Sequence, residues 1–262
     1  SGGSSWRSPS TADQYRDHDY ADFAQEFLNR NADYRQDHAD TMARIVTFPQ
    51  TEQEEQEGLS RRWGLSFPHR PAGKPARNAR ALVTRRRADV VIIEAEDPGQ
   101  AFPLPSGSEP LVDITAGEER HIVAAHDTAR LRLCVRLAPS RPFPTYAIPC
   151  DSACALRLAA AFRLQRVTSG NRIGADRAAL PTPNQRMRYT GLLRIHDALE
   201  AGASARDLAF GLIFPNHRPL AGAIWKGSGE RRHVLRLIAD ARRLSGPDIE
   251  GCSSIADRAR QG

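Results

Sequence analysis

The spacing of the apolar residues changes near Asp151, and this change constrains the fold more than any other feature of the sequence. In the stretch RLRLCVRL (130–137) apolar residues and arginines alternate, which is typical of a half-buried antiparallel strand. From Asp151 onward the apolar residues recur every three or four positions, which is the period of a helix. We therefore expect an α+β fold, with a short antiparallel sheet within 88–148 and a helical bundle after it.

Three helical segments are expected in the C-terminal part of the chain, each opened by a capping residue. These residues are Thr182, Ser204 and Ser228. The succession is similar to a helix-turn-helix module, in which the last helix enters the major groove of DNA. The stretch 215–227 separates the second helix from the third and is far longer than the standard turn, so the motif would be a variant.

The last of these segments, 228–244, carries its arginines opposite its apolar residues. At 100° per residue, Arg232, Arg236 and Arg243 fall within about 40° of one another, and the apolar residues fall on the far side. Guanidinium groups bind phosphates and guanine in a two-pronged manner, which makes this face a candidate DNA contact. A solvated basic face without a partner is the alternative. The candidate DNA-binding residues are Lys226, Ser228, Arg231, Arg232, His233, Arg236, Arg242 and Arg243.

The excess of positive charge lies in the same part of the chain. The whole chain has 37 basic and 31 acidic residues, for a net charge of +6. Within 180–245 the basic residues also outnumber the acidic ones by six. A localised basic surface of this kind is typical of proteins that bind nucleic acid.

A second amphipathic helix is expected near the N-terminus, where Tyr20, Phe23 and Phe27 fall on one helical face. This face is either the aromatic core of a small helical module, residues 1–48, or a surface that docks a partner. We keep these three aromatic residues as candidate partner-binding residues.

The remaining organisation is expected from composition. Residues 49–87 combine the acidic run EQEEQE with a segment rich in Pro, Gly and Arg, which is typical of a flexible linker. Residues 88–246 would then form one domain, the strand region followed by the variant helix-turn-helix bundle. Residues 247–262 would form a tail.

No feature of the sequence favours an enzyme, a cofactor or a metal site. The motifs of serine hydrolases, phosphate-binding loops and zinc proteases are absent, and EAED (94–97) has no second carboxylate cluster at convincing spacing. The four cysteines form no CxxC pair, so we interpret them as small buried side chains. No apolar run is long enough to cross a bilayer, and we expect a cytoplasmic protein.

Three passages resemble known proteins. The passage WRSPSTADQYRDHDYADFAQEFLNRNADYR resembles a transcriptional-regulator-like N-terminal domain. CALRLAAAFRL and the passage 203–244, which contains WKGSGERRHVLRL, resemble family 2285 of the domains of unknown function. The tandem is similar to the excision activators of integrative and conjugative elements in proteobacteria.

This resemblance implies a bacterial transcription activator with a variant helix-turn-helix, which controls genes for excision and conjugative transfer. It also implies control by a small antiactivator protein built from the same C-terminal domain. Only Trp225, Lys226 and the arginines of 231–243 match the family closely enough to carry a role over.

Two functions remain in competition. In the first, the C-terminal domain binds double-stranded promoter DNA and the N-terminal module contacts RNA polymerase or a second subunit. In the second, the chain is a protein-interaction regulator, such as an antiactivator, that does not bind DNA itself. Its contact surface would then be the N-terminal helix or the strand edge near 130–137.

Overall fold

The computed structural model divides the chain into two compact units, which are described separately. The first unit joins Ser1–Asn31 to Leu180–Gly262, and the second is Ala32–Ala179. The structure describes residues 6, 13–16, 18–63, 65, 90–97, 104–126, 129–140, 143–151, 154–170 and 181–246. The tail expected at 247–262 and most of the expected linker lie outside these residues.

The second unit contains a five-stranded sheet in the order β2-β3-β4-β1-β5. The strands are β1 (Val90–Ala95), β2 (Glu109–Ala116), β3 (Glu119–His126), β4 (Ala129–Leu137) and β5 (Thr145–Ala147). The expected strand over 130–137 is confirmed as β4, in the middle of the sheet. The sheet is mixed and not purely antiparallel, because β1 pairs with β4 in parallel.

The central position of β4 also changes its expected burial. Leu131, Leu133 and Val135 lie on one face, as the alternation predicted, and are buried. Arg132 and Cys134, on the other face, are buried as well, and Cys134 packs with apolar residues of β1 and β3. The strand is therefore covered on both sides over most of its length. The alternating pattern alone predicted only one covered side.

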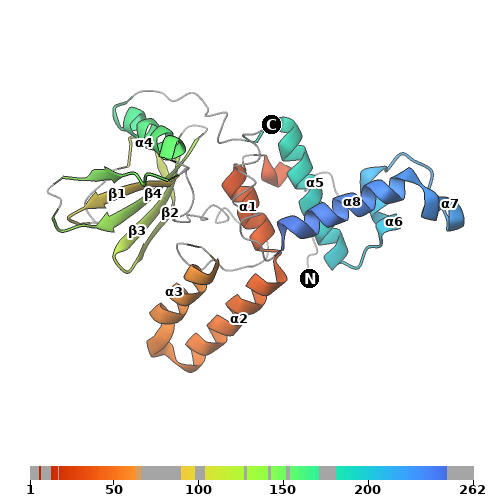
Figure 1. Ribbon diagram of the computed structural model, residues 1–262, viewed down its shortest axis with the longest axis horizontal. Coiled ribbons are helices and arrows are strands. Elements are labelled where there is room, and N and C mark those ends of the chain that lie inside the picture. The colour runs from red at the N-terminus through yellow and green to blue at the C-terminus, as the bar shows by residue number, and fades with distance from the viewer. Residues whose placement is uncertain are drawn as a thin grey trace. The chain divides into compact units, whose positions relative to one another are not determined.

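Helix α4 (Cys154–Thr168) packs against β1 in the second unit and lies along one face of the sheet (Figure 1). It turns small and aliphatic side chains toward the strands, namely Ala160, Ala161, Leu164 and Val167. The helix ends before Gly170, whose φ of 74° is the left-handed conformation that glycine adopts without strain. This confirms the helix predicted after Asp151.

The second unit also holds a pair of helices, α2 (Ala32–Thr47) and α3 (Glu52–Trp63), joined by the short helix η2 (Pro49–Thr51). The indole of Trp63 donates a hydrogen bond of 2.8 Å to Asp37 and contacts the ring of Tyr34. Arg44 pairs with Glu55 at 2.8 Å. Helix α3 occupies the stretch where a linker was expected to begin, so that expectation was wrong for 52–63.

The first unit consists of helices. They are α1 (Tyr20–Leu28), α5 (Pro183–Glu200), α6 (Ala205–Leu208), the π-helical turn η3 (Ala209–Ile213), α7 (Gly222–Gly227) and α8 (Gly229–Leu244). Helix α8 crosses α5, and these two helices form the largest contact within this unit (Figure 1). The capping residues predicted at Thr182 and Ser204 are confirmed, and each forms a full capping box.

Helix α1 shares one hydrophobic core with the C-terminal helices. Tyr20, Phe23 and Phe27 are buried in it, together with Trp6 and Tyr15. The C-terminal helices contribute aliphatic side chains, namely Leu192, Leu193, Ile195, Ala198, Leu208, Ala209, Val234, Ile238, Ala241 and Leu244. The segment before Asn31 thus forms part of the helical unit, whereas the sequence predicted a separate module over 1–48. No helix in the described parts of the chain combines the length and apolarity that crossing a membrane requires.

Candidate nucleic-acid interface

Helix α8 begins at a capping residue that also ends α7. The Ser228 side-chain oxygen accepts a hydrogen bond from the Arg231 backbone N–H at 3.1 Å, as predicted. The same hydroxyl donates to the Trp225 carbonyl at 2.9 Å. Ser228 therefore fixes the angle between the two helices. Its single hydroxyl proton is already used in the hydrogen bond to the Trp225 carbonyl.

The buried side of α8 is aliphatic, and the opposite side carries the arginines. Val234, Ile238, Ala241 and Leu244 are buried in the core of the first unit. Arg232, Arg236, Arg242 and Arg243 are exposed, while Arg231 and His233 are half-buried. Lys226, at the end of α7, is exposed as well. The opposed faces that the helical spacing predicted are therefore both present.

The arginines of α8 differ in whether a neighbouring carboxylate balances their charge. Arg243 lies 3.3 Å from Asp240, and Asp240 also pairs with Arg188 of α5 at 3.0 Å. Arg232 and Arg236 have no carboxylate within ion-pair distance among the described residues. Glu230, in the first turn, instead lies 3.6 Å from His217. Among the described residues, the positive charge of α8 that no carboxylate balances thus lies on Arg231, Arg232, Arg236 and Arg242.

A cluster of rings supports the exposed arginines from one side. His233 lies against Phe214, with ring centroids 5.7 Å apart, and Phe214 stacks on His217 at 5.0 Å. The His233 Nδ1 atom lies 2.8 Å from a terminal nitrogen of Arg236. Because an arginine can only donate, the His233 Nδ1 atom accepts this bond. His233 therefore orients Arg236.

The connection between η3 and α7 is long and is held by its own contacts. The Arg206 Nε donates to the Leu220 carbonyl at 2.7 Å. Trp225 packs on Phe210 with ring centroids 5.6 Å apart. The stretch between η3 and α8 also contains a short helix around Trp225, α7. The connection is thus longer than that of a standard helix-turn-helix, and the assignment to that motif stays a prediction.

The exposed side of α8 also contains residues that the sequence reading passed over. Leu235 is 41% exposed and Ala239 is exposed. On a helical wheel both lie within about 60° of Arg232, so their spacing in the sequence could have predicted that they share its exposed face. Ile224 of α7 is 71% exposed. Leu235 and Ala239 therefore lie beside the arginines on α8, and an apolar group in such a place can contact the methyl group of thymine.

The candidate partner-binding residues have a different position from the candidate DNA contacts. Tyr20 is 5% exposed, and Phe23 and Phe27 are fully covered. The Tyr20 hydroxyl donates a hydrogen bond to Gln185 at 2.9 Å, and Phe23 contacts the ring of Tyr189. Their surroundings are those of core residues, which was the other interpretation open at the sequence level.

Two groups of side chains in the described residues have the composition of a metal site. Glu119, His121 and Cys134 lie on adjacent strands with their ligand atoms within 4.8 Å of one another. Burial and the charge of Glu119 raise the pKa of the Cys134 thiol to about 12. Glu119 is also bound by Arg136 at 2.9 Å, which already neutralises it. The second group is His196, Asp197 and Glu200, and its Asp197 pairs with Arg30.

Comparison with known protein families agrees with this geometry. The family model for the proteobacterial transcriptional regulator-like domain matches residues 5–68. The model for the T6SS transcription factor DNA-binding domain matches residues 147–248, which include all of α8. The chain carries a DNA-binding domain and a transcriptional-regulator-like domain. Together they support a DNA-binding transcription regulator, and neither family is a family of enzymes.

These matches also settle part of the expected resemblance. The likeness of the N-terminal segment to a transcriptional-regulator-like domain is confirmed. The C-terminal match carries the description of a T6SS transcription factor, so membership of family 2285 and of the excision activators stays a prediction. No curated protein and no solved structure matches the chain.

Proposed function

We propose that this chain is a transcription activator that holds double-stranded promoter DNA through α8. The observation that carries the proposal is the position of Arg232 and Arg236. Both are exposed on the side opposite the buried Val234 and Ile238, and no described carboxylate neutralises them. This arrangement leaves two guanidinium groups available for phosphates and for base edges.

The remaining candidate residues take supporting roles in this proposal. Arg242 and Arg243, near the end of α8, contact phosphates, which raise affinity without reading sequence. Lys226 reaches a phosphate from the end of α7. Arg231 and His233 flank the central arginines, and His233 orients Arg236. Ser228 positions the helix, because its hydroxyl is used in capping.

The target genes follow only from resemblance. The likeness to excision activators favours genes for excision and conjugative transfer of a mobile element. In that scheme the chain acts in the cytoplasm, contacts RNA polymerase and is inhibited by a small antiactivator. The description of the matched family raises type VI secretion genes as a second set of targets. Sequencing of the DNA recovered with the chain from cells separates the two sets.

The test of DNA binding compares variants on the chain's own upstream DNA. Replacing Arg232 and Arg236 by alanine should abolish footprinting at moderate salt and should lower the slope of log affinity against log salt by about one per lost phosphate contact. The matched control is Arg166→Ala, an exposed arginine of α4. Unchanged binding by the double variant would remove the proposal.

The test of activation uses a reporter gene placed behind the bound promoter. Wild-type chain should raise transcription, and the double arginine variant should not, although it folds. A quantitative assay for the excised circular form of the element tests the mobile-element role in the same strains. Binding that lowers transcription would show a repressor and would contradict the activator proposal.

A further inference from the structure

An open pocket lies in the first unit on the side of α5. Its volume is about 810 Å³, within the range of roughly 300–1,000 Å³ that small-molecule sites occupy. Helix α5 supplies most of the lining, and η3, α8 and the N-terminal segment supply the rest. Its proximity to α8, through Leu237, places it directly behind the candidate DNA-binding face.

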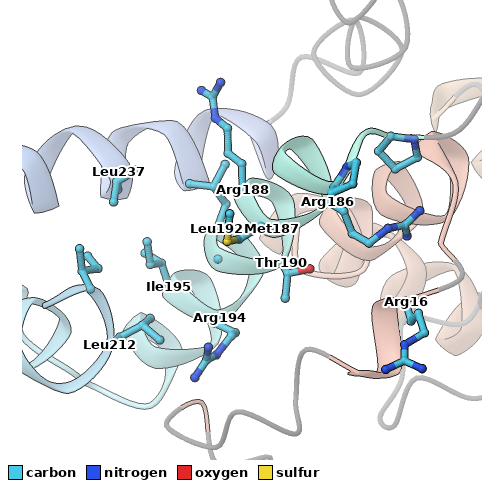
Figure 2. A pocket seen from close by; sticks show the side chains of 14 residues that line it. Arg16, Arg186, Met187, Arg188, Thr190, Leu192, Arg194, Ile195, Leu212 and Leu237 are labelled. Atoms are coloured by element: carbon cyan, nitrogen blue, oxygen red, sulfur yellow. The ribbon is translucent and has the colours of Figure 1, made fainter. Parts of the chain in front are cut away.

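The two ends of the pocket differ in chemistry (Figure 2). Leu237, Ile195 and Leu212 lie toward one end, and Arg186 and Arg16 lie toward the other, with Thr190 and Arg194 between them. The described residues that line the pocket include four arginines and no carboxylate. An apolar end and a basic end in one cavity match a ligand with an aliphatic body and an anionic head.

Arg194 is the arginine with the least compensation. Its Nε donates to the Trp6 carbonyl at 2.9 Å, and no described carboxylate pairs with it. Burial lowers the pKa of Arg194, because partial removal from water disfavours its charged form. An anion in the pocket would offset this cost.

The other arginines have different tasks. Arg186 donates to the backbone carbonyls of Tyr15 and His18 at 2.8 and 2.6 Å, so it holds the N-terminal segment while keeping its charge. Arg16 is exposed and lies 3.6 Å from Asp13. Arg188 pairs with Asp240 and points away from the pocket (Figure 2).

The wall of the pocket contains a glycine that the helix does not need. Gly191 lies inside α5, where glycine weakens a helix relative to alanine. A Cβ atom added to it would meet no atom within 4 Å, so close packing does not demand a glycine here. The missing side chain widens the pocket. The π-helical turn η3, which also lines the pocket, is a rare conformation that is frequent at functional sites.

We propose that this pocket binds a small amphiphile with one aliphatic chain and a singly or doubly charged anionic head. The chain lies between Ile195, Leu212 and Leu237, and the head lies near Arg16 and Arg194. A carboxylate and a phosphate share the required chemistry. Leu237 belongs to α8, so the ligand would contact the helix that carries the proposed DNA-binding face.

The binding test uses the full chain without DNA, so its outcome is independent of the proposed function. Calorimetry measures the binding of sodium dodecanoate, dodecyl phosphate and neutral dodecanol, each below its aggregation concentration. We expect saturable binding of one anion per chain, with dodecanol about tenfold weaker or more, because it lacks the charge that a guanidinium group binds. The tighter of the two anions identifies the head group.

Two variants separate this pocket from general hydrophobic binding. Gly191→Leu should fill the cavity and abolish binding, while the fold is kept because leucine is a better helix former. Gly58→Leu is the matched control, since Gly58 also lies in a helix and a Cβ there meets nothing within 4 Å. Arg16→Gln combined with Arg194→Gln should weaken the anions and leave dodecanol unchanged.

The outcomes that overturn the proposal are equally concrete. They are the absence of saturable binding, equal binding of dodecanol and dodecanoate, or binding that survives Gly191→Leu. Circular dichroism of each variant establishes that it is folded before its binding is compared.

Discussion

Arg30 and Asp197 form a two-pronged ion pair that joins the end of α1 to α5. The Arg30 Nε lies 2.6 Å from one carboxylate oxygen of Asp197, and a terminal nitrogen lies 3.1 Å from the other. Arg30 also donates to the carboxylate and the carbonyl of Glu26, both at 2.8 Å, and to the Tyr15 hydroxyl at 3.2 Å. Burial alone would lower the pKa of Arg30, but the hydrogen bonds and charge of Asp197 outweigh burial and raise this pKa above its ordinary value. Burial raises the pKa of the Tyr15 hydroxyl to about 12.

Asp197→Asn should destabilise the first unit, because it leaves the Arg30 charge with one carboxylate fewer in a largely buried place. The Arg30 side chain is 11% exposed and that of Asp197 is 22% exposed. We expect a loss of about 3 kcal/mol in the free energy of unfolding, the lower end for a broken buried pair. Urea unfolding measures it. The control is Arg61→Ala, which breaks an exposed pair in α3 and should cost less than about 1 kcal/mol. Equal losses in the two variants would contradict a structural role for the Arg30 pair.

The stability of the chain should fall in acid partly because of Glu26. Burial alone would raise the pKa of Glu26, but the nearby imidazole of His18, 3.9 Å away, and the charge and hydrogen bond of Arg30 outweigh burial and hold the pKa below its ordinary 4.5. A carboxylate with a lowered pKa stabilises the fold above the unfolded pKa, and this contribution is lost as the pH falls through the folded pKa. Glu26→Gln should therefore show a smaller loss of stability below pH 4.5 than the wild type.

Urea unfolding at a series of pH values measures this difference. Glu118→Gln, at an exposed position, serves as the control and should follow the wild-type curve. An unchanged slope in Glu26→Gln would show that other carboxylates account for the acid sensitivity.

The exposed Leu235 should read thymine methyl groups if α8 binds in the major groove. Deoxyuridine lacks that methyl group, so replacing single thymines in the footprinted site should lower the affinity of the wild type at one or more positions. Leu235→Ala should bind more weakly and should no longer distinguish thymine from deoxyuridine at those positions. Gel shifts at constant salt measure both effects. A variant that still discriminates between the two bases would assign the methyl contact to another residue.

The described cysteines should differ in reactivity. Cys134 is buried, and burial with the charge of Glu119 raises the pKa of its thiol to about 12, whereas Cys150 is exposed. Because the thiolate is the reactive form, iodoacetamide should modify Cys150 well before Cys134 in the folded chain. Peptide mass spectrometry follows both sites. In urea the two cysteines should react at similar rates, and equal rates in the folded chain would contradict the burial of Cys134.

The first residues of the C-terminal helices were predictable because helix capping depends on a few neighbouring residues. Thr182, Ser204 and Ser228 each accept a hydrogen bond from a backbone N–H three residues later. Such a contact needs no information about the rest of the chain. The opposed faces of α8 follow from spacing in the same way. Its pairing of Asp240 with Arg243 is also an i,i+3 contact that spacing could have indicated.

The partner of α1 was not predictable from its own residues. The spacing of Tyr20, Phe23 and Phe27 predicted an apolar face, and that face exists. The ion pair that fixes its position, however, joins residues 167 apart in the chain. Helical periodicity tells which side of a helix is covered and does not tell which helix covers it. The ion pair of Arg188 with Asp240 and the pocket that Arg188 helps to line also depend on long-range packing.

The helix within the expected linker shows how an average composition conceals local order. Glu52, Glu54 and Glu55 lie in the first turn of α3, where negative charge is favoured by the helix dipole. Leu59 and Trp63, four residues apart, are buried on one side of it. Both signals are present in the sequence, but the Pro- and Arg-rich residues that follow dominated the composition of 49–87.

The discontinuity of the helical unit has a consequence for biosynthesis. Its first thirty-one residues leave the ribosome before residues 32–179, and the helices that cover Phe23 and Phe27 come last. At about 5–20 residues per second, translation of residues 32–179 alone takes roughly 7–30 s, and the aromatic side chains are without their partners for at least that time. Only a chain translated as far as Leu244 can therefore assemble the core that carries α8, and a product that ends earlier exposes its aromatic residues to chaperones and proteases.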